Sequence, residues 1–190
     1  MNNFVKSLII SIVFTSFMLV DNGWAQQNPA KREQNKKEST VKTSKRSDRP
    51  APNILGRAPD FELQDIHQDI VTLNSYKNKQ PLVLFFWTTW CPFCQNELKV
   101  LNDRYAGLSE DGLEVLAINV GETPDKVQNF IQGYNLAYRV PLDKDSSVAR
   151  SYAVSGVPTY VLVDLEGFIV FQDNYFPQGQ YKELLAKKKI

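Results

Sequence analysis

Cys91 and Cys94 are the only two cysteines of the chain, and two residues separate them. They closely follow residues 81–86 (PLVLFF), a short run of large apolar side chains of the kind that forms a buried strand. After the cysteines, apolar residues recur every three or four positions, which is the spacing of one helix face. Pro92 suits the first turn of a helix, where its missing N–H needs no partner. The sequence therefore predicts a strand, a turn that carries Cys91, and a helix that begins near Pro92.

This position makes Cys91 a candidate nucleophile. Unpaired N–H groups and the helix dipole favour an anion at the N-terminal end of a helix. Cysteine thiols in such settings have a pKa of roughly 3.5–7.5 instead of about 8.5. Cys94, one turn further along, is expected to be less exposed and able to close a small disulfide ring. We predict that Cys91 is the attacking thiolate and that Cys94 is the resolving thiol.

Two unreactive roles for the cysteine pair fit the sequence less well. A disulfide that closes so small a loop constrains the unfolded chain little. A structural zinc site would need two more Cys or His ligands, whereas the sequence offers only His67, which is expected in an exposed polar turn. The pair is therefore interpreted as a redox centre, and no metal and no other cofactor is expected.

Residues 1–25 predict a signal peptide. Lys6 precedes an apolar run over residues 8–20, and Gly23 and Ala25 are small residues at the −3 and −1 positions of a cleavage site. The run is short for a membrane-spanning helix, which needs about 20 residues. A cleaved signal is expected, with an uncleaved membrane anchor as the alternative, because the cleavage region is imperfect. Either would place the rest of the chain in the periplasm or another extracytoplasmic compartment.

Residues 26–52 predict a disordered basic linker. They contain eight Lys or Arg and three acidic residues, with almost nothing apolar to bury. The charge could attract anionic lipid or nucleic acid, but no aromatic side chains interleave the basic ones, so a solvated linker is expected and a nucleic-acid partner is not. The remaining residues 53–190 are mildly acidic and are long enough for a single domain with one core.

Strand and helix patterns alternate within this domain. A hairpin is expected over residues 61–63 and 70–73, further strands at 82–88, 113–120, 137–140, 160–164 and 168–173, and helices at 92–108, 124–133, 146–152 and 179–187. This order indicates an α/β fold in which helices enclose a mixed sheet.

Several of these stretches resemble the thioredoxin superfamily. Residues 90–94 (WCPFC) follow an apolar strand, and residues 157–159 (VPT) lie well downstream. Similarity to the TlpA/ResA-like, AhpC/TSA-related branch is carried by residues 58–63 (APDFEL), 86–91 (FWTTWC) and 117–122 (AINVGE) and by Glu97. The resemblance covers nearly all of residues 54–176. It implies a thioredoxin-like three-layer sandwich with a central mixed sheet, an N-terminal β-hairpin and a βα insertion.

The resemblance also implies site residues. By that resemblance Pro158 is a cis-proline that faces the cysteines, and the backbone beside it, at Val157, pairs with an extended protein substrate. Glu97 is expected on the same helix face as Cys94. It would replace the buried aspartate of thioredoxins, whose position here is Phe85, in moving protons to and from the thiols. The alternative for Glu97 is a solvated surface glutamate.

Three residues around the cysteines complete the candidate site. Trp90, Pro92 and Phe93 are expected to contact partner proteins. Phe93 also belongs to the dipeptide between the cysteines, whose identity helps to set the reduction potential.

The resemblance implies an exported thiol–disulfide oxidoreductase that exchanges disulfides with protein partners. Reduction is the favoured direction, as in cytochrome c maturation, with a membrane-bound electron donor and a membrane tether through residues 1–25. One alternative is a thiol peroxidase, because Thr88 stands three residues before Cys91, although Leu84 occupies the position where that motif expects proline. Another is a thiol chaperone that holds Cu(I) between the cysteines, although no Met-rich or His-rich tract supports it.

Overall fold

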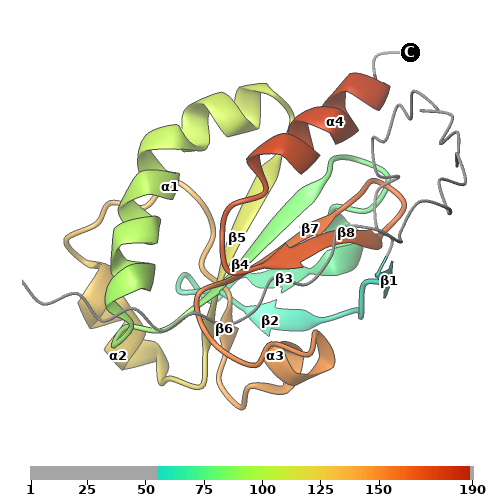
Figure 1. The fold of residues 1–190 in the computed structure, drawn as a ribbon. Helices are drawn as coiled ribbons and strands as arrows, with labels where there is room; N and C mark the ends of the chain where they lie inside the picture. Colours follow the sequence, from blue (N-terminus) through green and yellow to red (C-terminus); the bar gives the residue numbers. More distant parts are fainter. Residues whose placement is uncertain (1–54, 189–190) are drawn as a thin grey trace, which may run out of the picture. The chain divides into compact units, whose positions relative to one another are not determined.

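The computed structural model describes residues 55–188, so the predicted signal peptide (1–25) and basic linker (26–52) lie outside the described residues. A six-stranded mixed sheet forms the centre, with strand order β1-β8-β7-β4-β5-β6 (Figure 1). Its strands are β1 (Gly56–Arg57), β4 (Leu82–Trp87), β5 (Glu114–Val120), β6 (Leu142–Asp143), β7 (Thr159–Val163) and β8 (Phe168–Asp173). The helices are η1 (Leu73–Ser75), α1 (Pro92–Glu110), α2 (Pro124–Ile131), α3 (Ser147–Ser151) and α4 (Gln178–Lys188). A separate hairpin consists of β2 (Glu62–Gln64) and β3 (Ile70–Thr72).

Strand β4 is the centre of the core. All six of its residues are buried, and it pairs in parallel with β5 and antiparallel with β7. Because successive side chains of a strand point to opposite faces, a fully buried strand needs cover on both sides. Val83, Phe85 and Trp87 pack with residues of α1, α2 and α4, whereas Leu82, Leu84 and Phe86 pack with α3 and the hairpin region. The result is the three-layer sandwich with a mixed sheet that the sequence predicts.

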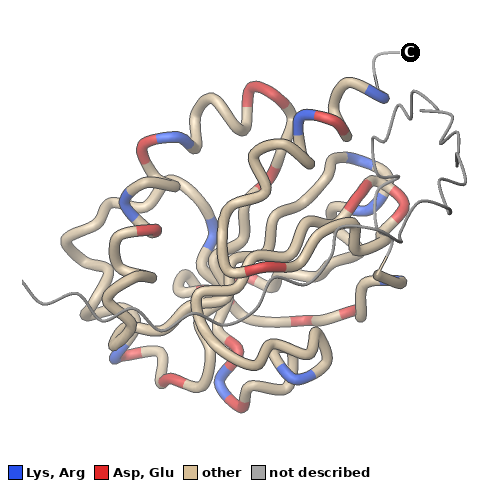
Figure 2. Tube along the Cα trace, in the orientation of Figure 1, with Lys and Arg blue, Asp and Glu red and all other residues tan. Residues whose placement is uncertain are grey.

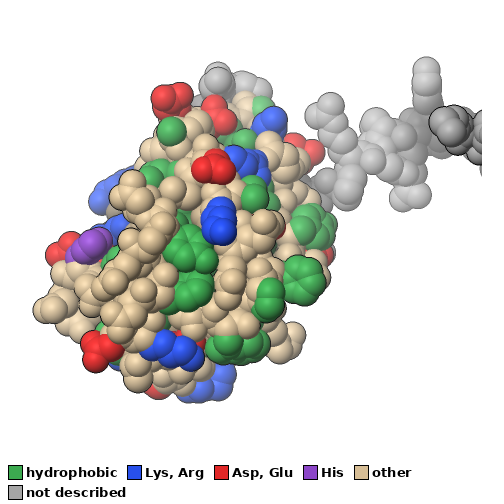
Figure 3. Space-filling view, turned by 90° about the vertical axis from the view of Figure 1, so that its left-hand side faces the viewer, with side chains coloured by type: hydrophobic (Ala, Val, Ile, Leu, Met, Phe, Trp, Pro, Cys, Tyr) green, Lys and Arg blue, Asp and Glu red, His purple; other side chains and the backbone are tan. Residues whose placement is uncertain are grey.

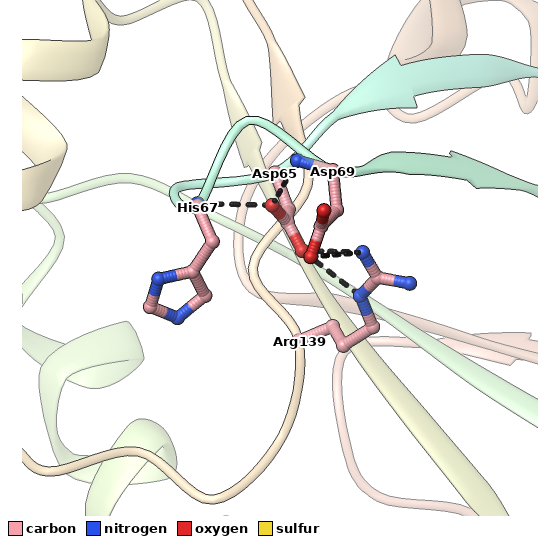
Figure 4. A network of polar contacts seen from close by, with 4 residues as sticks. All are labelled: Asp65, His67, Asp69 and Arg139. Carbon is pink, nitrogen blue, oxygen red and sulfur yellow. Dashed lines mark hydrogen bonds and ion pairs between the residues drawn. The ribbon is translucent and has the colours of Figure 1, made fainter.

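The hairpin is fixed to the sheet by a buried ion pair. Asp65, 3% exposed, accepts hydrogen bonds of 2.9 and 2.6 Å from the Arg139 guanidinium, and the backbone N–H groups of His67 and Asp69 donate to its other oxygen (Figure 4). Burial opposes ionisation of Asp65, but these hydrogen bonds outweigh it and hold the pKa of the carboxyl below its usual range. The His67 side chain points away from the carboxylate and is exposed, as expected.

One predicted strand is wrong. Residues 137–140 make only an isolated bridge, between Arg139 and Leu116, and the regular pairing with β5 begins at Leu142. Pro141 separates the two because it has no N–H to donate to a ladder. Tyr138 contributes a buried side chain here, which donates a 2.7 Å hydrogen bond to the carbonyl of Leu98 on α1. The other predicted elements form, with ends shifted by one or two residues.

Lys, Arg, Asp and Glu residues lie mainly on the helices and connecting loops (Figure 2). On the face shown in Figure 3, Lys, Arg, Asp and Glu side chains of both signs are scattered around a central group of hydrophobic side chains. None of the helices between residues 55 and 188 combines the length and hydropathy that crossing a membrane requires.

Candidate active site

The two cysteines form a disulfide at the N-terminal end of α1, with a Cα–Cα distance of 5.2 Å. Cys91 is the N-cap residue of the helix, and its Sγ accepts a 3.1 Å hydrogen bond from the backbone N–H of Cys94. Pro92 occupies the first turn, where a backbone N–H would have no partner within the helix. The predicted strand–turn–helix arrangement is therefore present, with the N–H of Cys94 directed at the Cys91 sulfur.

The disulfide is buried, and two neighbouring aromatic residues are exposed. Cys91 is 4% exposed and Cys94 is completely buried, whereas Trp90 and Phe93 are 67% and 77% exposed. Exposed large aromatic side chains beside a reactive group are typical of a surface that binds a partner.

The loop before β7 approaches the disulfide from the other side. The Val157–Pro158 peptide bond is cis, as the resemblance implies, and the carbonyl oxygen of Val157 lies 3.8 Å from Sγ of Cys91. The two segments are 66 residues apart in sequence, so only the antiparallel pairing of β7 with β4 brings them together.

A groove of about 550 Å³ runs between this loop and the start of α1. Four of the predicted site residues line it, namely Phe93, Glu97, Val157 and Pro158. Trp90 and Pro92 are exposed near the disulfide but are not part of the lining. The rest of the lining is small or polar: Asn96, Ser155, Gly156, Thr159 and Asn174.

Glu97 is half-buried and has a partner that sequence reasoning missed. The hydroxyl of Tyr160 donates a 2.6 Å hydrogen bond to Oε2 of Glu97. Tyr160 lies on β7, and its ring stacks on Phe85, the residue at the position where thioredoxins carry a buried acid. No local signal identifies this contact, because it depends on how β7 pairs with β4.

Glu122 is a second residue that sequence reasoning missed. Its carboxylate accepts 2.7 Å hydrogen bonds from the backbone N–H and the hydroxyl of Thr89, and a 2.8 Å hydrogen bond from the Asn119 amide. It also forms a 2.7 Å ion pair with Lys126. Burial opposes its ionisation, but these partners outweigh it and keep the pKa of Glu122 below its usual value. Thr89 stands two residues before Cys91, so Glu122 holds the turn that presents the disulfide. The only signal of Glu122 in the sequence is its place at the end of residues 117–122, one of the stretches that resemble the TlpA/ResA-like branch.

In the described part of the chain, no group of three or more His, Cys, Asp or Glu side chains is placed so that it could hold a metal ion. What the arrangement can do is exchange a disulfide, since its sulfurs are linked, hydrogen-bonded and adjacent to a groove.

The chain is similar to proteins of known family. The AhpC/TSA family matches residues 54–172. The thiol-disulfide oxidoreductase ResA of Bacillus cereus (strain ZK / E33L) is 33% identical over 124 residues, which are 65% of this chain and 71% of that protein. ResA of Bacillus subtilis (strain 168) is 37% identical over 113 residues, which are 60% of this chain and 63% of that protein.

A solved structure shows the same fold. The thioredoxin domain of a thiol-disulfide oxidoreductase from Bacteroides vulgatus aligns with 73% of this chain and 97% of its own, with a TM-score of 0.59 and 22% identity. The predicted fold and family are thus confirmed. The chain belongs to the AhpC/TSA family within the thioredoxin superfamily, in the ResA-like group of thiol–disulfide oxidoreductases.

Proposed function

We propose that this protein reduces disulfides of partner proteins outside the cytosol, with Cys91 as nucleophile and Cys94 as resolving thiol. The observation that carries the proposal is the contact between the Cys91 sulfur and the Val157 carbonyl, beside cis-Pro158, at the edge of a groove. A partner cysteine that enters this groove would reach Cys91 before Cys94, because Cys94 is completely buried.

The first step forms a mixed disulfide. In the reduced protein the Cys91 thiolate attacks one sulfur of the partner disulfide, a bond forms between those two sulfurs, and the second partner sulfur leaves as a thiolate. The N–H of Cys94 and the N-terminal end of α1 face Cys91 and stabilise its negative charge before attack.

The second step releases the partner. Cys94 loses its proton, its thiolate attacks Sγ of Cys91, and the first partner sulfur leaves as a thiolate. Two electrons have then passed from the dithiol to the partner, and the Cys91–Cys94 disulfide is restored. Glu97 follows Cys94 by one helical turn and lines the groove, so it is the carboxylate available to accept that proton.

An extended cysteine-bearing segment suits the groove best. Ser155, Gly156 and Thr159 offer small or polar contacts for a polypeptide backbone, and Phe93 offers an apolar surface for a side chain. When an extended peptide pairs with the edge of a strand or loop, main-chain hydrogen bonds supply the affinity. The natural substrates we propose are therefore cysteine-bearing segments of proteins.

Export and resupply of electrons belong to the same proposal. Residues 1–25 would direct the chain out of the cytosol or anchor it, and residues 26–52 would act as a tether. A membrane-bound donor would then reduce the Cys91–Cys94 disulfide after each cycle, since the cytosolic thiol systems do not act there directly.

Trapping tests the proposal. Cys94→Ala should leave Cys91 joined to its natural partner as a mixed disulfide that survives non-reducing electrophoresis and disappears with a reductant. The matched control is Cys91→Ala, which keeps one cysteine but should trap nothing. Equal capture by both variants would contradict the assigned roles, and peroxide consumption without any trapped protein would favour a peroxidase.

A further inference from the structure

Tyr160 connects the two sides of the active site through its hydroxyl group. It follows Thr159 of the groove wall, and its hydroxyl donates to Oε2 of Glu97 at 2.6 Å. Glu97 lies on α1, one turn after Cys94. The bond therefore links the strand that follows Pro158 to the helix that begins at the disulfide.

The phenol has little freedom to move. Tyr160 is completely buried, and its ring stacks on Phe85, its register partner on β4, with ring centroids 4.7 Å apart. Phe176 covers it edge-on, with centroids 5.8 Å apart. A ring enclosed in this way directs its hydroxyl along one line, and Glu97 lies on that line.

The hydroxyl also keeps its proton. Burial, followed by the hydrogen bond to Glu97, raises the pKa of Tyr160 well above its usual range. Two other titratable groups affect this pKa. Tyr138, from the loop before β6, also raises the pKa of Tyr160, whereas Arg104 on α1 lowers it. Tyr160 is therefore a donor throughout the pH range in which thiols exchange.

We propose that Tyr160 is a positioning residue for thiol–disulfide exchange, which holds Oε2 of Glu97 so that Oε1 is presented to the Cys94 thiol. The inference rests on the proposed function, in which that thiol must lose its proton in the second step. The proton passes from Sγ of Cys94 to Oε1 of Glu97, the sulfur then attacks Cys91, and the partner sulfur leaves as a thiolate. A glutamate without this tether would sample several rotamers, and few of them would face Cys94.

Tyr160→Phe tests the role, because it removes the hydroxyl and keeps the ring. The probe is oxidised glutathione, added to the reduced protein over a range of pH. Glutathionylation of Cys91 in the Cys94→Ala background reports the first step. Release of the second glutathione, with Cys94 present, reports the second step.

We expect Tyr160→Phe to slow the second step about 3- to 10-fold at neutral pH, the range for loss of one hydrogen bond. The first step should stay within about twofold of the parent rate. The pH dependence of the second step should approach that of Glu97→Gln, and adding Tyr160→Phe to Glu97→Gln should change nothing more.

Tyr138→Phe is the matched control. It also removes a buried hydroxyl that bonds to α1, but the acceptor is the carbonyl of Leu98. This variant should lose stability without moving the pH profile. The inference is overturned if Tyr160→Phe keeps the parent profile, if the two effects add in the double variant, or if Glu97→Gln itself changes nothing. Failure of the parent protein to form or resolve any mixed disulfide would instead overturn the proposed function, and Tyr160's role with it.

Discussion

At the scale of single residues, Glu122 shows how a buried charge can support a reactive turn. The carboxylate meets donors from Thr89, Asn119 and Lys126, so its ionised form is fully hydrogen-bonded. A buried charge that is satisfied in this way becomes costly to alter, because each donor then loses its partner. The same carboxylate thus contributes to stability and fixes the backbone two residues before Cys91.

Glu122→Gln should lower the free energy of unfolding at neutral pH by about 1–3 kcal/mol, because an amide cannot accept from all of these donors. Since the folded state lowers the pKa of Glu122, its contribution is present above the usual value of about 4.5 and is lost as the pH falls through the folded-state pKa. In urea unfolding at a series of pH values, the difference in free energy of unfolding between parent and variant should therefore become smaller in acid. Glu110→Gln, at an exposed glutamate of α1, is the control and should change little at any pH. A gap that widens in acid would contradict this account.

Glu122 and Tyr160 also show what the sequence could not reveal about the site. Cys91, Cys94 and Pro158 belong to short motifs that can be recognised locally. Glu122 contacts a residue 33 positions away, and Tyr160 contacts one 63 positions away. Such contacts depend on which strands pair, so they become visible only in the folded chain.

At the scale of elements, the strands and helices with strong local patterns were predicted well. Strand β4 is a continuous apolar run, and α1 repeats apolar residues every three or four positions, so each carries its own signal. Strand β6 has two residues and lies at the edge of the sheet, where pairing with β5 defines it. The sequence prediction therefore placed this strand too early, on the wrong side of Pro141.

Strand β6 also prepares the start of α3. Asp143, which is completely buried, accepts hydrogen bonds from the backbone N–H groups of Val148 at 3.2 Å and Ala149 at 2.8 Å. These N–H groups are in the first turn of α3, where no intrahelical partner exists. Asp143, a strand residue, thus caps the N-terminal end of α3.

Asp143→Ala should lower the free energy of unfolding by about 1–3 kcal/mol, since two buried donors lose their acceptor. Asp145→Ala is a matched control, because Asp145 is exposed and its carboxylate accepts a hydrogen bond from the backbone N–H of Ser147 at the same helix start. Urea unfolding monitored by circular dichroism would compare the two. Equal losses in both variants would show that burial of Asp143 does not matter.

At the scale of the whole molecule, a partly buried ion pair helps to hold the hairpin. Asp65 on the hairpin side and Arg139 before β6 are 74 residues apart in sequence, and their contact closes the fold beside β5 and β6. The Arg139 side chain is 36% exposed, whereas that of Asp65 is 1% exposed, so water screens one partner only. Loss of Arg139 would leave a buried carboxylate with backbone donors alone.

Arg139→Gln should therefore lower the free energy of unfolding at neutral pH by about 1–3 kcal/mol, less than for a fully buried pair. The folded state lowers the pKa of Asp65, so this contribution is present above the usual value of about 3.8 and is lost as the pH falls below it. Urea unfolding at neutral and acidic pH would measure both effects. Arg150→Gln, at an exposed arginine of α3, is the control and should have a small effect that varies little with pH. If Arg139→Gln lowered the free energy of unfolding equally at both pH values, its effect would come from packing and not from charge.

The Cys91 sulfur belongs to an almost completely buried residue, whereas Phe93 beside it is exposed and lines the groove, and under the proposed function this difference limits when the protein can meet a substrate. A sulfur held within a folded surface would have difficulty reaching so buried a residue, whereas an extended segment of chain could enter the groove beside Phe93. We therefore expect disulfide exchange with cysteines of polypeptides that have not yet folded around them. Reduction would then occur before the partner protein folds, and disulfides of folded proteins would not be reduced.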